Sequence, residues 1–592
     1  MTDLREDMRT MLRTIFKIPD RKEKLRLVLM LFMILISTGL ELLGVASIQP
    51  LIEAVTDPTV LDKGRLFPFL KSLIRTENNT DLVIFMALAL ALIFVIKNLY
   101  LIWMNSVFFR FSYDLQQTIS LRMMQGYLKR DYSFHVKHNV AELQRNVETD
   151  VGRFYLTMIS LLQLITELMV CSALFVLLAF TDLATTILVT ALMGILVVLL
   201  LFVLRKRIKY LGERNREYCM LRLKWFLKSF GGIKEIKVSG KENYFFHGYE
   251  DSFRNFTKVA YEQSILNNLS KPVVEMVFVG GIMIFMALRI SWGKDLEEFV
   301  PVLSVFAMAA LRMMPSFNRI SGQMNSIMFN RSSVDAIYRE LEEMKAIKEQ
   351  TRLEQKGETL HINEGIRVEH LDFHYSSKAD TEVLKDVSLF IPKKHSVALV
   401  GPSGAGKTTL ADIILGIYDP VRGAVLADDK KIHENLDSWH KLIAYIPQNI
   451  YLMDDTIRNN IAFGIPEEEI NDEKIWQVLE EAQLDDFVRE QPQQLDTIVG
   501  DRGVRLSGGQ RQRIGIARAL YPDPEFLVLD EATSALDTET ETAVMDAIYR
   551  LSGKITMVVI AHRITTIRGC DEIYRISEGK AEKISYEEAS AT

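Results

Sequence analysis

The stretch GPSGAGKTT, residues 401–409, decides the fold of the C-terminal half of the chain. It follows the apolar segment HSVALV and precedes ADIILGIY, so we expect a strand, a glycine-rich loop and a helix in that order. In a loop of this pattern backbone N–H groups surround phosphate, Lys407 reaches the outer phosphates and Thr408 ligates magnesium. The sequence therefore predicts a site for ATP and Mg²⁺. Its expected binding residues are Gly401, Pro402, Ser403, Gly404, Ala405, Gly406, Lys407, Thr408 and Thr409.

A second stretch, FLVLDEATSALD (526–537), supplies candidate catalytic carboxylates. Its apolar start predicts a buried strand, and Asp530 at the tip can hold magnesium together with Thr408. Glu531 beside it can orient or deprotonate the attacking water. LSGGQRQR lies between the two stretches, and VVIAHR places His562 at the end of another apolar strand. This order of motifs predicts an ATP-hydrolysing α/β P-loop domain, with Glu531 and His562 as catalytic residues.

The composition separates the chain into two unlike parts. Its 592 residues carry 70 basic and 76 acidic side chains, a net charge of -6 that gives no hint of a nucleic-acid partner. Residues 1–350 hold 43 basic and 34 acidic side chains, a net of +9, and the remainder has a net of -15. The hydrophobic share of 48% excludes a disordered chain, and three widely separated cysteines suggest no disulfide scaffold or CxxC metal site.

Apolar stretches long enough to cross a membrane fill the first part. A spanning helix needs about 20 mostly apolar residues. The alternative of buried helices in a soluble protein is disfavoured, because these stretches have no polar face. We therefore expect an α-helical membrane domain of six spans, residues 1–340, fused to the α/β P-loop domain, residues 341–592. The six stretches are 25–51, 82–109, 154–180, 183–204, 272–290 and 299–328.

Basic residues predict the orientation of these spans. The N-terminal segment and the two long connections after the second and fourth spans hold 29 basic residues, against 6 in the other connections. The bias places both termini and the long connections in the cytoplasm. Each long connection reads as helix, break, helix, so we expect a short transverse helix at each turn. The outer connection contains LFPFLKSLI (66–74), either a short helix on the membrane surface or an ordinary loop.

Together these motifs make the chain resemble an ATP-binding cassette (ABC) transporter of the exporter type. The resemblance implies that Gln448 in YIPQN bridges magnesium and the membrane domain, and acts in catalysis. It also implies that Tyr375 in FHYSS stacks on adenine and that Asp537 belongs to the D-loop. The LSGGQ signature would close over the partner subunit's nucleotide through Ser507, Gly508, Gly509 and Gln510.

Because the signature acts in trans, the resemblance implies a dimer. All the motifs are intact, so a homodimer with two competent sites is the simplest expectation. A heterodimer stays open as the alternative, although such pairs usually carry one damaged site. The expected location is a bacterial inner membrane.

Charged residues within the expected spans give evidence about the transported substrate. Such residues are costly in lipid and usually face a cavity or a partner. Arg312 and Arg319 lie seven residues apart on one helix face in ALRMMPSFNRI, and Lys97 and Lys271 add positive charge. These four residues predict a site for an anionic headgroup, such as a pyrophosphate carrying sugars. The alternative is that they pair with carboxylates, namely Glu41, Glu167 and Glu275.

Three stretches resemble a bacterial lipid-linked oligosaccharide flippase of the protein glycosylation pathway. They are ALRMMPSFNRI, LFPFLKSLI and AYIPQNIYLMDDTIRNNIAFG. The resemblance implies an ATP-driven translocase for a polyprenyl-diphosphate oligosaccharide, with an exporter of other lipids or of drugs as the main alternative. A soluble ATPase of repair or translation is excluded by the spans. A channel would need a disabled site or a regulatory segment, and neither is seen.

Overall fold

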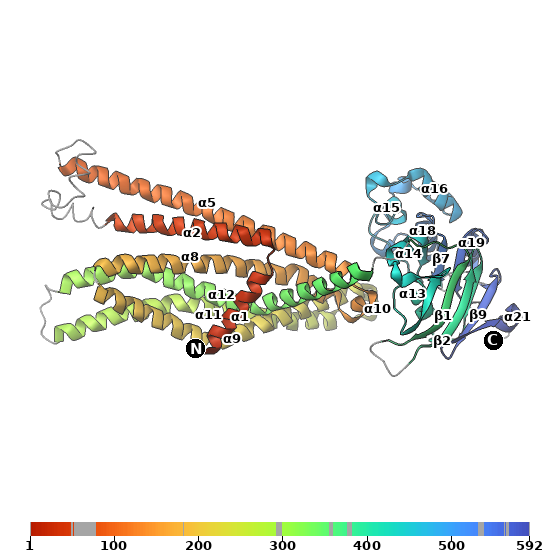
Figure 1. Cartoon of the computed structure of the whole chain (residues 1–592), viewed down its shortest axis with the longest axis horizontal. Coiled ribbons are helices and arrows are strands. Elements are labelled where there is room, and N and C mark those ends of the chain that lie inside the picture. The colour runs from red at the N-terminus through yellow and green to blue at the C-terminus, as the bar shows by residue number, and fades with distance from the viewer. Residues whose placement is uncertain are drawn as a thin grey trace. The chain divides into compact units, whose positions relative to one another are not determined.

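Figure 1 shows a computed structural model of the chain, in which the described residues are 2–48, 51, 79–181, 183–291, 299–354, 359–375, 382–530, 538–561, 563 and 567–590. The chain separates into two compact units. The first comprises Met1–Arg130 and Val136–Lys345, and the second comprises Asp131–His135 and Ala346–Thr592.

The first unit is built from long helices. Three helical stretches among the described residues are long and apolar enough to cross a membrane, namely Arg21–Ala46, Thr80–Leu128 and Val140–Phe180. Large apolar side chains such as Leu88 and Leu92 are about 60% exposed, as expected for a surface that faces lipid. The other expected spans fall on helices, but the count of six stays a prediction. The helices are α1 (Thr2–Lys17), α2 (Arg21–Ala46), α5 (Asn79–Leu128), α8 (Val151–Thr181), α9 (Leu183–Gly231), α11 (Glu242–Ser291) and α12 (Phe299–Glu354).

Short helices interrupt the two long connections, as the sequence predicts. The first holds α6 (Tyr132–Lys137), α7 (Val140–Gln144) and the π-helix η2 (Arg145–Asp150). The second holds α10 (Ile233–Ser239), which ends at Gly240 in the left-handed conformation. The segment LFPFLKSLI lies outside the described residues.

A buried polar cluster ties the helices of the first unit together at η2. Asp150 is fully buried and accepts hydrogen bonds from Arg216 Nε at 2.8 Å and from Ser333 Oγ at 2.7 Å. Arg145 lies 3.4 Å from the same carboxylate. These contacts join η2 to α9 and α12. A π-helix inserts an extra residue into a turn, which re-aims its side chains, and such turns often mark functional positions.

Helices α9 and α12 also approach closely at a glycine. A Cβ atom at Gly212 would lie 2.0 Å from the carbonyl oxygen of Phe329. Only glycine is small enough for this crossing, so backbone contact and the polar cluster hold the same pair of helices.

The described residues of the second unit form two sheets. The smaller sheet is antiparallel, with strand order β2-β1-β4-β5. The larger has the order β10-β9-β3-β8-β7-β6, and all of its pairings are parallel except that of β10 with β9. The strands are β1 (Gly365–Phe373), β2 (Leu384–Pro392), β3 (Ser396–Val400), β4 (Arg422–Ala427), β5 (Lys430–Lys431), β6 (Ile443–Ile446), β7 (Phe526–Asp530), β8 (Thr556–Ile560), β9 (Glu572–Ser577) and β10 (Lys580–Ile584).

Helices cover the larger sheet, whose central strands β3, β7 and β8 are mostly apolar. Strands β7 and β8 are buried at every residue, as parallel strands covered on both faces require. The helices of this unit are α13 (Lys407–Ile414), α14 (Leu436–Leu442), α15 (Ile457–Ile461), α16 (Asp472–Glu481), α17 (Asp485–Glu490), α18 (Gly508–Leu520), α19 (Thr538–Tyr549) and α21 (Tyr586–Ser590).

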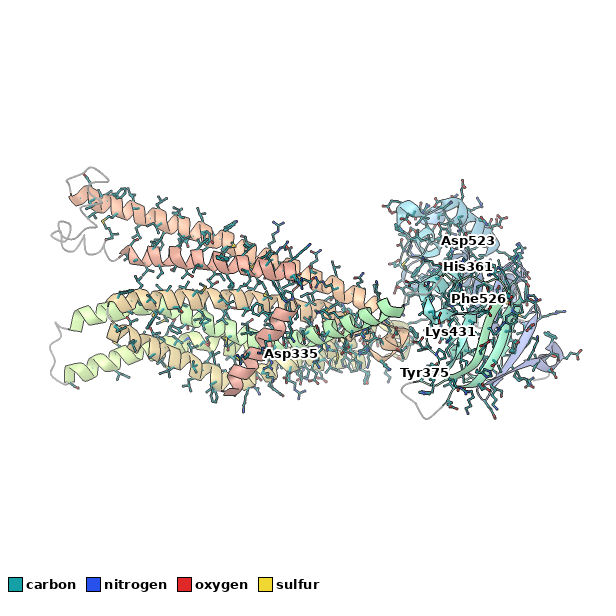
Figure 2. The ribbon with its side chains drawn as sticks, viewed as in Figure 1. Asp335, His361, Tyr375, Lys431, Asp523 and Phe526 are labelled. Atoms are coloured by element: carbon teal, nitrogen blue, oxygen red, sulfur yellow. The ribbon has the colours of Figure 1, made fainter. Side chains whose placement is uncertain are left out.

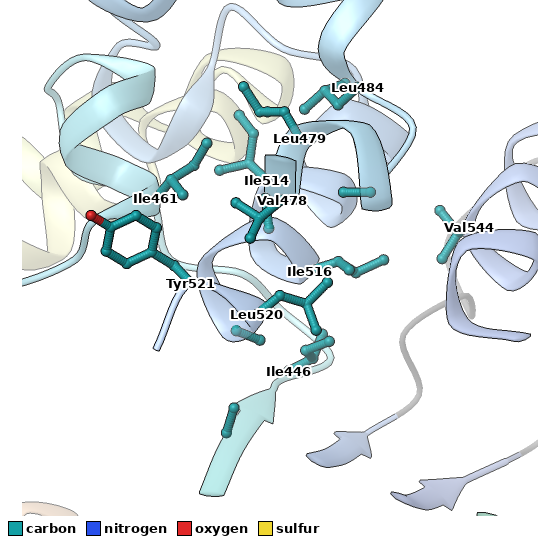
Figure 3. Close-up of a cluster of buried hydrophobic side chains, with 14 of the residues drawn as sticks. Ile446, Ile461, Val478, Leu479, Leu484, Ile514, Ile516, Leu520, Tyr521 and Val544 are labelled. Carbon is teal, nitrogen blue, oxygen red and sulfur yellow. The ribbon is translucent and has the colours of Figure 1, made fainter. Parts of the chain in front are cut away.

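Two large apolar clusters and one small one form the core among the described residues of this unit. One large cluster packs Val478 and Leu479 of α16 against Ile514 and Leu520 of α18 and against β6 (Figure 3). The second large cluster surrounds Trp439, which is fully buried and whose indole N–H donates to the Ile414 carbonyl at 2.9 Å. The second cluster fixes α13, and with it the glycine-rich loop that precedes this helix.

Candidate nucleotide site

The glycine-rich loop connects β3 to α13, as the sequence predicts. Gly401 has φ 141° and Gly406 has φ 104°, conformations that favour glycine. A Cβ atom at Gly401 would lie 2.1 Å from the Ile576 carbonyl oxygen. The loop therefore needs glycine for close packing on β9 as well as for its curl. Of the predicted binding residues here, Pro402, Ser403, Gly404 and Thr408 are exposed, and Ala405 is half-buried.

Lys407 opens α13 and turns back over the loop. Its side chain is buried, and Nζ donates to the carbonyl oxygens of Gly401 at 2.8 Å and Pro402 at 3.1 Å. The ammonium is thus held at the N-terminal end of a helix, where backbone N–H groups and the helix dipole also favour an anion. This arrangement fits phosphate.

Thr409 and Tyr375 meet beside the loop. The two hydroxyl oxygens lie 2.8 Å apart, and Tyr375, labelled in Figure 2, lies edge-on to Phe373. Tyr375 stays a prediction as the residue that stacks on adenine.

Asp530 ends β7, as predicted, and is 7% exposed. With the hydroxyl of Thr408 it forms a donor set that fits Mg²⁺, because magnesium in such sites is held by one or two carboxylates together with phosphates and waters. The described residues contain no group of three or more His, Cys, Asp or Glu that could hold a metal by themselves. When bound with the nucleotide, magnesium would supply positive charge beside the phosphates.

Two residues near Asp530 were missed by sequence reasoning. The Tyr445 hydroxyl donates to Asp530 Oδ2 at 3.4 Å, and burial, followed by the charge of Asp530, raises the pKa of this phenol above its usual range. Burial and then the charge of Asp530 raise the pKa of Asp412 to about 6. Tyr445 precedes the YIPQ glutamine by three residues, and Asp412 lies on α13 one turn beyond Thr408. Only the folded sheet brings them to Asp530.

The signature forms the start of α18. Ser507 caps this helix: its Oγ accepts from the Gln510 N–H at 3.2 Å, and Gln510 Oε1 accepts from the Ser507 N–H at 2.8 Å. Ser507 is exposed, Gly508 and Gln510 are half-buried, and Gly509 is buried. This reciprocal cap fixes the direction in which the first N–H groups of α18 point.

The signature helix is also joined to the segment that follows Gln448. Arg518 Nη1 donates to the Tyr451 carbonyl at 2.7 Å, and its Nε donates to the Asn460 carbonyl at 2.7 Å. A Cβ atom at Gly515 would lie 1.9 Å from the side chain of Ile450. Gln448 itself is exposed. No sequence pattern predicts this connection, because the two shortest hydrogen bonds of Arg518 are to backbone carbonyls, which every residue carries.

Three predicted site residues, Glu531, Asp537 and His562, lie outside the described residues. Their roles stay predictions.

Two protein-family models match the chain where the motifs lie. The ABC transporter transmembrane region matches residues 27–295, and the ABC transporter model matches residues 384–534. A third model, for IstB-like ATP-binding proteins, matches residues 308–423, which include the glycine-rich loop.

The chain belongs to the ABC transporters.

Known proteins resemble this transporter over both of its parts. It is 27% identical over 468 residues to the ATP-dependent lipid A-core flippase of Ralstonia nicotianae, a match that covers 78% of this chain and 77% of the relative. It is 34% identical over 365 residues to multidrug resistance protein 1 of Entamoeba histolytica; that match covers 59% of this chain and 28% of the relative's length. A solved bacterial Atm1-family ABC exporter with ATP bound has a TM-score of 0.75 at 23% identity, with coverage of 97% of this chain and 99% of that one.

The predicted fold class is confirmed: a helical transmembrane domain is fused to a P-loop nucleotide-binding domain. The prediction of an ATP-hydrolysing transporter of the exporter type is confirmed as well. The narrower resemblance to an oligosaccharide flippase stays a prediction.

The membrane charges of the transporter are partly paired. Lys97 Nζ lies 2.6 Å from Glu41 Oε2 and over the ring of Phe94. Arg319 forms an ion pair with Glu167, with Nη2 at 3.0 Å from Oε2.

The other two predicted substrate residues differ from these. Lys271 is exposed on α11, and so is Glu275. Arg312 belongs to α12, but its side chain lies outside the described residues. The pairing alternative therefore holds for two of the four cations, Lys97 and Arg319.

Proposed function

We propose that this transporter uses ATP to flip an anionic amphipathic lipid, a polyprenyl-diphosphate oligosaccharide, across a bacterial inner membrane. The single observation that supports this is the cationic side chain of Arg319 at membrane depth. Its side chain is 54% exposed in the chain, whereas that of its partner Glu167 is 14% exposed. A guanidinium at this depth is energetically costly, and such residues usually face a cavity or a partner and mark functional sites. Its planar N–H donors match the geometry of a phosphate group.

Arg312 shares the helix face of Arg319 and is proposed to bind the same headgroup, with Lys97 and Lys271 as further contacts. The proposed alternative is export of other lipids or of drugs. The names of the relatives, a lipid A-core flippase and a multidrug resistance protein, favour that broader class.

Transport in reconstituted vesicles tests the substrate. Vesicles with and without a polyprenyl-diphosphate-linked sugar are compared for ATP hydrolysis and for movement of the lipid between leaflets. We expect stimulation by this lipid, and we expect Arg312→Ala with Arg319→Ala to lose flipping. Normal flipping by the double variant would refute the headgroup role, and stimulation by a cationic drug alone would favour the alternative.

We further propose that two copies of the chain act together, with each signature completing the partner's nucleotide site and with both termini in the cytoplasm. A mixed dimer with Lys407→Ala in one copy and Ser507→Arg in the other places both defects in one composite site. We expect nucleotide binding at one site per mixed dimer, and we expect both single-variant homodimers to be nearly inactive. Full hydrolysis by an isolated monomer would contradict the proposal.

A further inference from the structure

Helices α8 and α12 carry matched polar side chains at helical spacing. Gln323 Nε2 donates to Gln163 Oε1 at 2.6 Å, and Ser160 Oγ donates to Ser326 Oγ at 3.0 Å. The pair of Arg319 with Glu167 is the next rung of the same series. As the numbers fall along α8 they rise along α12, so the two helices run antiparallel and meet once in each turn. We call this series the α8–α12 ladder.

The charged rung of the ladder uses only part of the guanidinium. Arg319 Nε and Nη2 donate to the two oxygens of Glu167, and Nη2 also donates to Ser316 Oγ at 3.3 Å. Nη1 has no partner among the residues that the structure describes. An arginine carries five N–H donors in a plane, so an anion can make its first contact at Nη1 before the pair with Glu167 opens.

The other two rungs carry no charge. Glu167 is the carboxylate that Arg319 contacts in this series. The uncharged rungs do not alter the charge balance of this pair. Any anion that approaches Nη1 meets attraction from Arg319 and repulsion from Glu167. The net electrostatic attraction that the site offers an anion is the difference between these two interactions.

We propose that Glu167 is a positioning residue that competes with the anionic headgroup for Arg319 and so resets the site after transport. The inference rests on the proposed function, because it takes the headgroup to be an anion. Binding draws Arg319 away from Glu167, and return of the ladder to its paired form releases the headgroup. The carboxylate thus lowers the affinity for the headgroup and speeds its release.

The test variant is Glu167→Gln, which keeps the shape and the hydrogen-bond acceptor and removes the charge. The probe is a polyprenyl-diphosphate-linked monosaccharide in vesicles. We expect the concentration that half-stimulates ATP hydrolysis to fall about tenfold, the equivalent of one lost charge interaction of about 1.4 kcal/mol. We expect the maximal rate of lipid movement to fall at the same time, because release is slower. A purely structural contact would not move these two quantities in opposite directions.

Two further variants complete the design. Gln163→Ala breaks the neighbouring rung without changing charge, and its half-stimulating concentration should stay at the wild-type value. Glu167→Asp restores the charge and should return both quantities toward wild type, which guards against misfolding of the first variant.

The outcomes separate the inference from the function on which it rests. If the lipid stimulates the wild type and Glu167→Gln matches it, the inference is wrong and the proposed function stands. If the same shift appears in Gln163→Ala, the effect is one of helix packing and the inference is also wrong. If the lipid stimulates neither wild type nor any variant, the proposed function itself fails.

Discussion

Lys407 and Arg319 are both basic residues at candidate binding sites, but their partners lie at very different distances along the chain. Lys407 donates to the carbonyl oxygens of Gly401 and Pro402, within its own loop. Arg319 pairs with Glu167, 152 positions away on another helix. The contacts of Lys407 therefore lie within one short motif, which the sequence shows directly. The contacts of Arg319 depend on how two helices pack, and no local pattern shows which partner it takes.

The largest expected effect concerns the nucleotide site, where the motifs are contiguous in sequence. Glu531→Gln removes the proposed water-positioning carboxylate next to Asp530. We expect ATP hydrolysis to fall by roughly 10² to 10⁴, the usual cost of a lost general base. MgATP binding should persist, so the ATP-bound dimer should accumulate. Glu525→Gln is the control: Glu525 immediately precedes β7, its Oε2 lies 3.9 Å from Lys393 Nζ, and the variant should hydrolyse ATP normally. Retention of half the wild-type rate by Glu531→Gln would exclude this role.

The next prediction concerns the helical unit, where the contacts depend on how the helices pack. Asp150→Asn removes the fully buried carboxylate that Arg216 and Ser333 share. Loss of one partner from a buried ion pair strands the other charge and costs about 3–5 kcal/mol. We expect a large fall in thermal stability in detergent.

Asp335→Asn is the matched control for Asp150→Asn. Asp335 pairs with Arg331 at 3.5 Å one turn away in the same helix and is 39% exposed, so its loss should cost at most about 0.5 kcal/mol. Equal stabilities of the two variants would show that the cluster at η2 does not hold the helices together.

The same comparison explains what the sequence could predict. The fold class, the loop from residue 401 to 409 and the strand ending at Asp530 followed from contiguous patterns, because their chemistry depends on neighbours in the chain. The short helices α6 and α10 followed from breaks in long polar helices. Asp412, Tyr445 and Arg518 could not be found this way. Each reaches its partner across a sheet or between helices, and single polar residues in apolar surroundings give no periodic signal.

The membrane charges show the same limit. The sequence placed Lys97 and Arg319 at membrane depth, and it offered Glu41 and Glu167 among three possible carboxylates. It could not choose the pairs, because the register between two helices depends on how side chains of both pack. Antiparallel α8 and α12 meet at Glu167 only because the rungs at Gln163 and Ser160 are also in register.

A smaller effect separates folding from function inside the ATPase unit. Ser507→Ala and Asn471→Ala each remove the side chain that caps a helix, α18 and α16 respectively. Each should lower stability by about 1 kcal/mol. Only Ser507→Ala should also impair ATP hydrolysis, because Ser507 belongs to the signature. Thermal unfolding and steady-state hydrolysis measured on both variants check this. An equal loss of hydrolysis in Asn471→Ala would mean that cap stability alone explains the effect.

The smallest expected effect is a change in pH dependence within the first unit. Burial, followed by repulsion from Glu343, raises the pKa of Glu340, whose Oε1 lies 3.5 Å from Asn146 Nδ2. An acid with a raised pKa in the folded state loses its proton more readily on unfolding. Its contribution to stability therefore falls as the pH rises from the unfolded pKa, near 4.5, through the folded one, and the loss is complete above that.

Glu340→Gln should remove this loss, so that the variant gains stability relative to wild type as the pH rises from about 4.5 toward 7. The control is Glu342→Gln, since Glu342 is 49% exposed and pairs with Lys345. Unfolding temperatures measured across this range should diverge from wild type for Glu340→Gln and should run parallel for Glu342→Gln. Parallel curves for both would mean that the buried contacts around Glu340 do not oppose its ionisation.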